Sequence, residues 1–208
     1  MVNKKYIDNK KILKIGITGG TGSGKTSVCK HLIDKGFQVI DSDKIARKIL
    51  DEDSDAYNSV VSHFGKLILK SNGEIDRKKL GSIVFDSPKD LEFLQNIVTK
   101  KTVERVKDIM DTAVPEKKII FLDAPILFEV GLDKYVDVVW MVLASRDQRI
   151  KRLSKRDGIS DAEIEKRMAA QMPENEKKKL SDVLILNNGS LDELHLRIDE
   201  LLLNFIQS

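Results

Sequence analysis

The chain has 208 residues, of which 33% are charged and 41% are hydrophobic, and its formal net charge is +3. This length favours one domain with a sizeable core and an inserted or appended helical part. The composition excludes a disordered chain, and no apolar run reaches the roughly 20 residues of a membrane-spanning helix. A single cysteine, Cys29, excludes an internal disulfide and a cysteine-based metal cluster. We therefore expect a cytoplasmic protein that has no signal peptide and does not bind membranes.

Five short apolar runs alternate with helical patterns along the chain. They span residues 12–18, 37–40, 118–123, 136–143 and 182–186. Strands that alternate with helices predict a parallel sheet covered by helices on both faces. The sequence therefore predicts a three-layer α/β fold with a five-stranded parallel sheet.

The first apolar run leads into the segment GGTGSGKT, which matches the phosphate-loop pattern G-x-x-x-x-G-K-[ST] between a strand and a helix. Glycines let the backbone N–H groups fold around a phosphate, and the positive end of the next helix faces the same anion. Lys25 can bridge the outer phosphates, and the Thr26 hydroxyl can ligate Mg²⁺. The residues expected to bind ATP in this loop are Gly20, Thr21, Gly22, Ser23, Gly24, Lys25, Thr26 and Ser27.

Two aspartates follow the second apolar run in the segment IDSDKIAR. Asp41 and Asp43 stand at the carboxyl end of the predicted strand, where open parallel sheets bind ligands. Alternate residues of an extended segment point the same way, so both carboxylates can face one site. Aspartate is also a favoured helix N-cap, and that interpretation stays open for one of the two. We interpret Asp43 as the functional carboxylate and place Asp41 closer to strand packing or Mg²⁺.

The region between the second and third apolar runs has helical patterns and no convincing strand. It predicts a helical cap, inserted over the binding edge of the sheet. The predicted single domain then has a core of residues 12–53, 114–147 and 181–208, a cap of about 54–113, and a lid of about 148–180.

The predicted lid follows the fourth apolar run and begins with the segment SRDQRIKRLSKRDG. Arg149, Arg152 and Arg156 have the spacing that projects three side chains from one face of a helix. A solvated basic face is the plainer interpretation of such a pattern. The turn at Asp157-Gly158 and a second helix over about 160–172 favour a hinged lid that carries arginine to the phosphates.

A phosphate loop alone does not identify a substrate. A GTPase would need a guanine-reading N-K-x-D segment, which the chain lacks. The 33 acidic residues are interspersed with 36 basic ones, which favours small anionic ligands over nucleic acid. A small-molecule kinase needs a base, positive charge over the phosphoryl group and a lid, and the sequence has a candidate for each.

Eight segments together resemble the dephospho-CoA kinase family from about Lys14 onward. They are GITGGTGSGKT, IDSDKIAR, HFGKLIL, GEIDRKKLGSIVF, DAPILFEVGLDKYVD, KRLSKRDG, AAQMP and NNGSLDEL. The middle and late segments are more specific than the phosphate loop. The resemblance implies a P-loop kinase that uses ATP with Mg²⁺. It implies phosphoryl transfer to the ribose 3′-hydroxyl of dephospho-CoA, the last step of coenzyme A synthesis.

The resemblance also implies roles for individual residues. Asp43 would orient and deprotonate the ribose hydroxyl, Arg152 would contact the transferring phosphoryl group, and Asn188 would lie near the adenine of ATP. The other residues expected at the acceptor are Thr18, Arg47, Phe64, Arg77, Leu127, Phe128 and Glu129. For Asp123, a role in holding Mg²⁺ through water and a plain place at the strand end both stay open.

The chain departs from the family pattern at two places. Thr99-Lys100 stands where the family often has a His-Pro pair, so no site role is assigned there. Thr26 stands where serine is usual, which keeps the Mg²⁺-binding hydroxyl. Two alternatives stay open: a kinase of a nucleoside or nucleotide, and a P-loop regulatory or nucleic-acid-binding ATPase, which salt-dependent binding to DNA or RNA would support.

Overall fold

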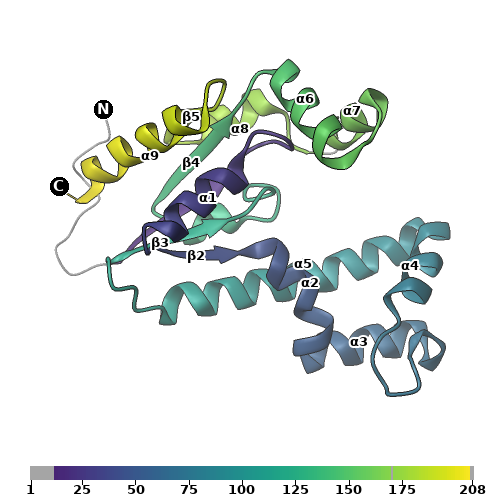
Figure 1. The fold of residues 1–208 in the computed structure, drawn as a ribbon. Coiled ribbons are helices and arrows are strands. Elements are labelled where there is room, and N and C mark those ends of the chain that lie inside the picture. The colour runs from purple at the N-terminus through teal and green to yellow at the C-terminus, as the bar shows by residue number, and fades with distance from the viewer. Residues whose placement is uncertain (1–11, 170, 207–208) are drawn as a thin grey trace. The chain divides into compact units, whose positions relative to one another are not determined.

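The computed structural model of the chain describes residues 12–169 and 171–206 (Figure 1). Residues 207–208 of the predicted core and Ala170 of the AAQMP segment lie outside the described residues. The contacts divide the described chain into two compact units. Residues 12–41 and 112–206 form the sheet unit, and residues 42–111 form the helical unit.

The sheet unit contains the predicted five-stranded parallel sheet. Its strands are β1 Leu13–Thr18, β2 Gln38–Asp41, β3 Ile119–Asp123, β4 Val138–Leu143 and β5 Val183–Leu186. Their spatial order is β2-β3-β1-β4-β5, and every neighbouring pair is parallel. All six residues of β4 are buried, as expected for a strand covered on both faces. The predicted fold class is confirmed.

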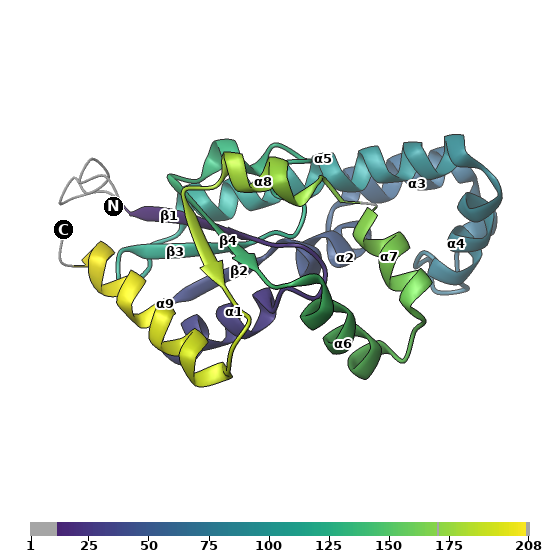
Figure 2. The same cartoon turned by 90° about the horizontal axis from the view of Figure 1, so that it is seen from above.

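Helices cover both faces of this sheet. The helices α1 Lys25–Asp34 and α9 Leu191–Ile206 lie on one face, and α8 Glu174–Leu180 lies on the other (Figures 1 and 2). Val28 of α1 and Ile198 of α9 are fully buried with Trp140 of β4 in one hydrophobic cluster. This cluster fixes the start of α1, and therefore the phosphate loop, at the carboxyl end of β1.

Two further helices follow β4 where the lid is predicted. They are α6 Arg146–Asp157 and α7 Asp161–Ala169. Gly158 ends α6 in the left-handed conformation, with φ of 65°, and its N–H group donates to the carbonyl of Ser154. Glycine adopts this conformation without steric cost, which explains why the chain turns at the predicted place. A short 3₁₀ turn, η3 Leu132–Tyr135, precedes β4.

The helical unit has a hydrophobic core of its own. Its helices are α2 Ser42–Glu52, α3 Ser54–Phe64, α4 Arg77–Asp86 and α5 Pro88–Thr112, with the 3₁₀ turn η2 Lys66–Ile68 between α3 and α4. Ile49 and Leu50 of α2 are buried against Ala56 and Val60 of α3. Because α2 packs in this way, the helical unit begins at residue 42, whereas the expected cap begins at about residue 54. Within the described residues, none of the helices has the length and apolarity needed to cross a membrane.

Candidate active site

The phosphate loop joins β1 to α1, and its glycines are required by its shape. Gly22 and Gly24 have φ of 82° and 94°, a region that other residues enter at a steric cost. A Cβ atom on Gly24 would lie 2.0 Å from Nδ2 of Asn187. The Ser27 N–H group bonds back to the carbonyl of Gly24 at 2.9 Å and starts the helix. Thr26 is exposed in the first turn of α1, where N–H groups at a helix start favour anions.

The lysine of this loop is paired with an aspartate at the end of β3. The ammonium group of Lys25 donates to Oδ1 of Asp123, and both side chains are largely buried. Asp41 stands opposite Asp123 in the register of β2 and β3, so two carboxylates share the carboxyl end of the sheet. Burial raises the pKa of the Cys29 thiol, and the charge of Asp123 raises it further. Cys29 is therefore a neutral core residue, and Asp123 is the group that holds the lysine.

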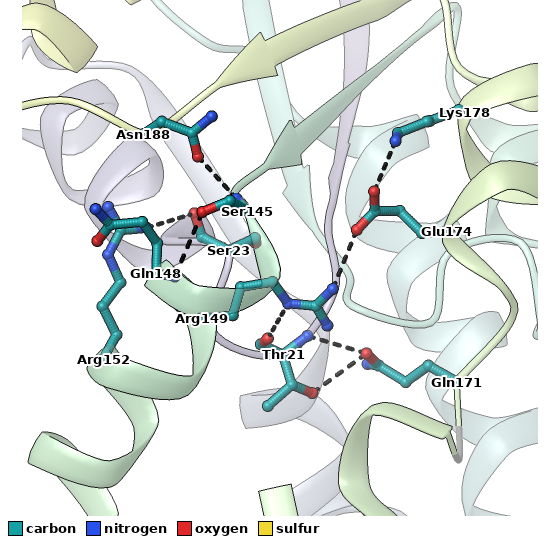
Figure 3. A network of polar contacts seen from close by, with 10 residues as sticks. All are labelled: Thr21, Ser23, Ser145, Gln148, Arg149, Arg152, Gln171, Glu174, Lys178 and Asn188. Carbon is teal, nitrogen blue, oxygen red and sulfur yellow. Dashed lines mark hydrogen bonds and ion pairs between the residues drawn. The ribbon is translucent and has the colours of Figure 1, made fainter. Parts of the chain in front are cut away.

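Arg149 of α6 reaches the phosphate loop from the lid side (Figure 3). Its Nε donates to the carbonyl of Thr21 at 2.8 Å, and its Nη1 donates to Glu174 at 3.0 Å. Only 7% of Arg149 is exposed. Burial lowers the pKa of its guanidinium group, and the Glu174 carboxylate opposes this shift. Arginine stays charged in proteins even so, which makes this a partly buried ion pair beside the loop, since 35% of the Glu174 side chain is exposed.

The other two arginines of the predicted basic face lie in different surroundings. Arg152 donates to the carbonyl of Ser23 at 3.3 Å and to the carbonyl of Asn187 at 3.0 Å. Asn187 in turn donates from Nδ2 to the same Ser23 carbonyl at 2.8 Å. Arg156 is exposed and pairs with Asp157 at the end of α6. The structure thus brings Arg149 and Arg152, but not Arg156, to the phosphate loop.

The segment after β5 lies beside the start of α6. Oδ1 of Asn188 accepts a hydrogen bond from the Ser145 N–H group at 2.7 Å (Figure 3). Ser145 caps α6 through the N–H group of Gln148. The predicted adenine segment is therefore hydrogen-bonded to the residue that caps the first lid helix. This contact lies next to the phosphate loop, which Asn187 contacts at Ser23.

A buried lysine organises the loop that follows β3. Lys177 of α8 is 1% exposed, and its Nζ donates to the carbonyl of Pro125 at 2.7 Å and to Oε1 of Glu129 at 2.8 Å. The hydroxyl of Thr18, which is fully buried, donates to the same Pro125 carbonyl at 3.2 Å. Glu129 also accepts the Met172 N–H group at 3.0 Å. Two residues expected at the acceptor, Thr18 and Glu129, are thus held by backbone groups and by Lys177.

The neighbouring residues of that loop differ in exposure. Leu127 is fully buried, and its side chain would meet a Cβ atom on Gly16 at 3.1 Å. Phe128 is partly exposed. Leu127 is therefore a packing residue of the sheet unit, and Phe128 is the one of the two with surface to offer a ligand.

The remaining predicted acceptor residues belong to the helical unit. Asp43 and Arg47 are exposed on α2, with Asp43 in its first turn. Arg77 begins α4 and donates to Asp51 at 2.9 Å and to the backbone carbonyl of Arg47. Phe64 is 9% exposed, and its ring packs edge-on against Phe93 in the core of the unit.

A cavity of about 780 Å³ lies within the helical unit. Its lining includes Tyr57, Lys70, Arg77 and Lys78. Ligand pockets commonly measure about 300–1,000 Å³, so this cavity has the size of a site for a small molecule. The hydroxyl of Tyr57 donates to the carbonyl of Gly73 at 2.6 Å and ties the 69–76 loop to α3.

Two residues of the site, Gln171 and Lys177, had no role from sequence reasoning, and Arg149 was predicted only as one of three arginines on the lid helix. The spacing of the arginines places Arg149 on a basic face, but spacing carries no information about burial. Lys177 lies in the charged run ENEKKKL, where a solvated surface is the usual expectation. Gln171 lies in the AAQMP segment, and the resemblance of that segment to the family was the one sequence signal that could have pointed to Gln171.

Comparison with known proteins gives a consistent picture. The sequence pattern that defines dephospho-CoA kinases matches residues 13–193. A dephospho-CoA kinase of Fusobacterium nucleatum is 39% identical over 188 residues, which cover 90% of this chain and 96% of the relative. One of Carboxydothermus hydrogenoformans is 42% identical over 182 residues, 86% of this chain and 87% of the relative. The solved structure of a dephospho-CoA kinase from Campylobacter jejuni superposes with a TM-score of 0.73 at 28% identity. The superposition covers 93% of this chain and 97% of the Campylobacter jejuni chain.

Proposed function

The chain belongs to the dephospho-CoA kinase family, and we propose that it transfers the γ-phosphoryl group of ATP to the ribose 3′-hydroxyl of dephospho-CoA. The products are coenzyme A and ADP, in the last step of coenzyme A synthesis. The observation that carries this proposal is the family match over residues 13–193, which contain the phosphate loop, the helical unit and both lid helices. The enzyme is expected to work in the cytoplasm.

The sheet unit supplies the groups that act on ATP. The 20–27 loop binds the phosphate chain through backbone N–H groups other than those of Thr21, Ser23 and Ser27, which are bonded within the protein. Lys25 moves from Asp123 to the outer phosphates when the nucleotide binds. Arg152 contacts the loop at the Ser23 carbonyl and provides a second positive charge beside the nucleotide. Positioning and electrostatic stabilisation of the spreading charge provide most of the rate enhancement.

Asp43 is the proposed base. Its carboxylate is exposed in the first turn of α2 and is not part of the hydrophobic core of the helical unit. In the reaction it accepts the proton of the ribose 3′-hydroxyl, and the oxygen attacks the γ-phosphorus in line with the departing ADP. Arg47 and Arg77 lie near each other on α2 and α4, and they are the proposed partners for anionic groups of the acceptor.

Mg²⁺ is the proposed divalent ion. The described residues contain no group of three or more histidine, cysteine or carboxylate side chains suited to a metal. Mg²⁺ takes most of its ligands from phosphates and water and one or two from the protein, so it does not need such a group. The Thr26 hydroxyl, with Asp41 or Asp123 acting through water, would hold the ion, which neutralises charge on the phosphates when bound.

The test is ADP release from the purified protein with MgATP, measured with and without dephospho-CoA. Adenosine and AMP serve as competing acceptors in parallel reactions. The proposal expects strong stimulation by dephospho-CoA alone. Equal stimulation by adenosine or AMP would support a nucleoside or nucleotide kinase, and no stimulation by any acceptor would leave only nucleotide binding.

A further inference from the structure

Thr21, the third residue of the phosphate loop, forms hydrogen bonds with two side chains, those of Arg149 and Gln171 (Figure 3). Its N–H group donates to Oε1 of Gln171 at 3.0 Å, and its hydroxyl donates to the same oxygen at 3.2 Å. Its carbonyl accepts the hydrogen bond from Nε of Arg149 at 2.8 Å. One loop residue thus has every polar group bound by side chains from other segments of the sheet unit.

The segment that carries Gln171 is itself anchored. The Met172 N–H group donates to Glu129 at 3.0 Å. Glu174 pairs with Arg149 at 3.0 Å, and the buried Lys177 pairs with Glu129 at 2.8 Å. Residues 171–177 are therefore anchored at several points beside the phosphate loop. Because its segment is already anchored, Gln171 loses little conformational freedom when it contacts Thr21.

The loop needs such support because of its own composition. Thr21 lies between two glycines, Gly20 and Gly22, which constrain the backbone least. The loop binds phosphate through the directions of its N–H groups, and a misplacement of about 1 Å can cost on the order of 100-fold in rate. Arg149 packs closely against Gly20 and Leu153 against Gly22, but a cavity of about 190 Å³ borders Gln171 and Gly20. Beside that cavity the hydrogen bonds from Thr21 to Gln171 are the restraint.

We propose that Gln171 is a positioning residue for phosphoryl transfer, which acts by fixing Thr21 and with it the middle of the phosphate loop. This role rests on the proposed kinase function. Gln171 is not required to touch the substrates. It contributes a single acceptor oxygen that sets where the N–H group and the hydroxyl of Thr21 point.

The first test replaces the amide by an apolar side chain of similar length, Gln171→Leu. We expect kcat to fall about 10-fold to 100-fold while the KM for ATP changes less than about threefold, because positioning is lost and binding is retained. Gln38→Leu makes the same chemical change at an exposed residue at the amino end of β2 and is expected to leave both constants unchanged.

A double-mutant cycle separates this role from a general structural one. Thr21→Val removes the hydroxyl and keeps the N–H group, so it is expected to lower kcat by a smaller factor than Gln171→Leu. If Gln171 acts through Thr21, the Thr21→Val effect disappears in the Gln171→Leu background. Effects that multiply in the double variant would overturn the proposal. The Thr21→Val variant also tests the contact if Gln171→Leu fails to fold.

The remaining outcomes are distinct. Wild-type kcat in Gln171→Leu would refute the positioning role and leave the kinase function intact. Tighter ATP binding in that variant, with an undiminished kcat, would mean that Gln171 competes with the nucleotide and would also refute the role. A wild-type protein without dephospho-CoA-dependent ADP release would contradict the proposed function itself, and the positioning role with it.

Discussion

The ammonium group of Lys25 lies against the carboxylate of Asp123, which joins the start of α1 to the end of β3. Both side chains are largely buried, with 13% and 14% exposed. A buried pair of this kind is costly to break unless another charge replaces the lost partner. A phosphate chain in the loop is such a replacement, and the pair therefore keeps the lysine at the sheet edge until ATP takes it over.

Replacing this lysine should remove catalysis more than it disturbs the fold. Lys25→Met keeps much of the apolar length of the side chain and deletes the charge that meets the developing charge of the transition state. We expect kcat to fall by about 10²–10³-fold, the usual cost of losing one such stabilising group. Single-turnover kinetics with dephospho-CoA measures the loss. Lys30→Met, an exposed site on the same helix, is the matched control, and equal effects at both sites would contradict the assignment.

The proposed base gives a second prediction. Asp43→Asn removes the proton acceptor and keeps the size of the side chain, so most phosphoryl transfer should be abolished while ATP binding is nearly unchanged. Titration calorimetry measures the binding, and the acceptor-dependent release of ADP measures the transfer. Asp34→Asn, at the exposed end of α1, provides the control. Wild-type turnover in the Asp43→Asn protein would remove this residue as the base.

Two glycines offer a matched pair of substitutions. Gly24→Ala places a Cβ atom 2.0 Å from Asn187 in a left-handed backbone, a conformation that costs other residues about 1–2 kcal/mol. Gly81→Ala, within helix α4, meets nothing within 4 Å, and the gain in helix propensity is about 0.5–1 kcal/mol. We expect the first to lower stability and nucleotide affinity and the second to raise stability slightly. Urea denaturation and nucleotide titration of both variants test this contrast.

Asp199 of α9 gives a prediction about pH. Burial favours a raised pKa for its carboxyl group, but hydrogen bonds from Lys35 at 2.9 Å and His31 at 2.8 Å outweigh it, and the pKa is lowered from 3.8. A lowered pKa in the folded state adds stability above the unfolded pKa, which is lost as the pH falls through the folded value. Asp199→Asn should therefore be less stable than the wild type at neutral pH.

That difference should shrink as the pH falls well below 3.8. Denaturation curves of the wild type and of Asp199→Asn, recorded at neutral pH and at a pH well below 3.8, provide the measurement. A difference between Asp199→Asn and the wild type that stays constant over this range would show that the carboxylate charge is not the source of the stability.

The sequence predicted the sheet well because its central strands β1, β3 and β4 are buried on both faces and form continuous apolar runs, such as VVWMVL in β4. The phosphate loop was predictable for a similar reason, since its shape restricts which residues fit. The surroundings of the three lid arginines could not be predicted in the same way. Arg149 is buried because Glu174 and the carbonyl of Thr21 satisfy it, and both partners are distant in sequence. Helical spacing describes one helix and cannot identify the segment against which it folds.

The central claim is that the phosphoryl group goes to the ribose 3′-hydroxyl of dephospho-CoA. The most direct measurement compares this acceptor with an analogue that has hydrogen in place of that hydroxyl. We predict that the analogue binds, inhibits the reaction competitively with dephospho-CoA, and releases no ADP above the background with ATP alone. Stimulation of ADP release by the analogue to the level of dephospho-CoA would show that another oxygen accepts the phosphoryl group and would contradict the account.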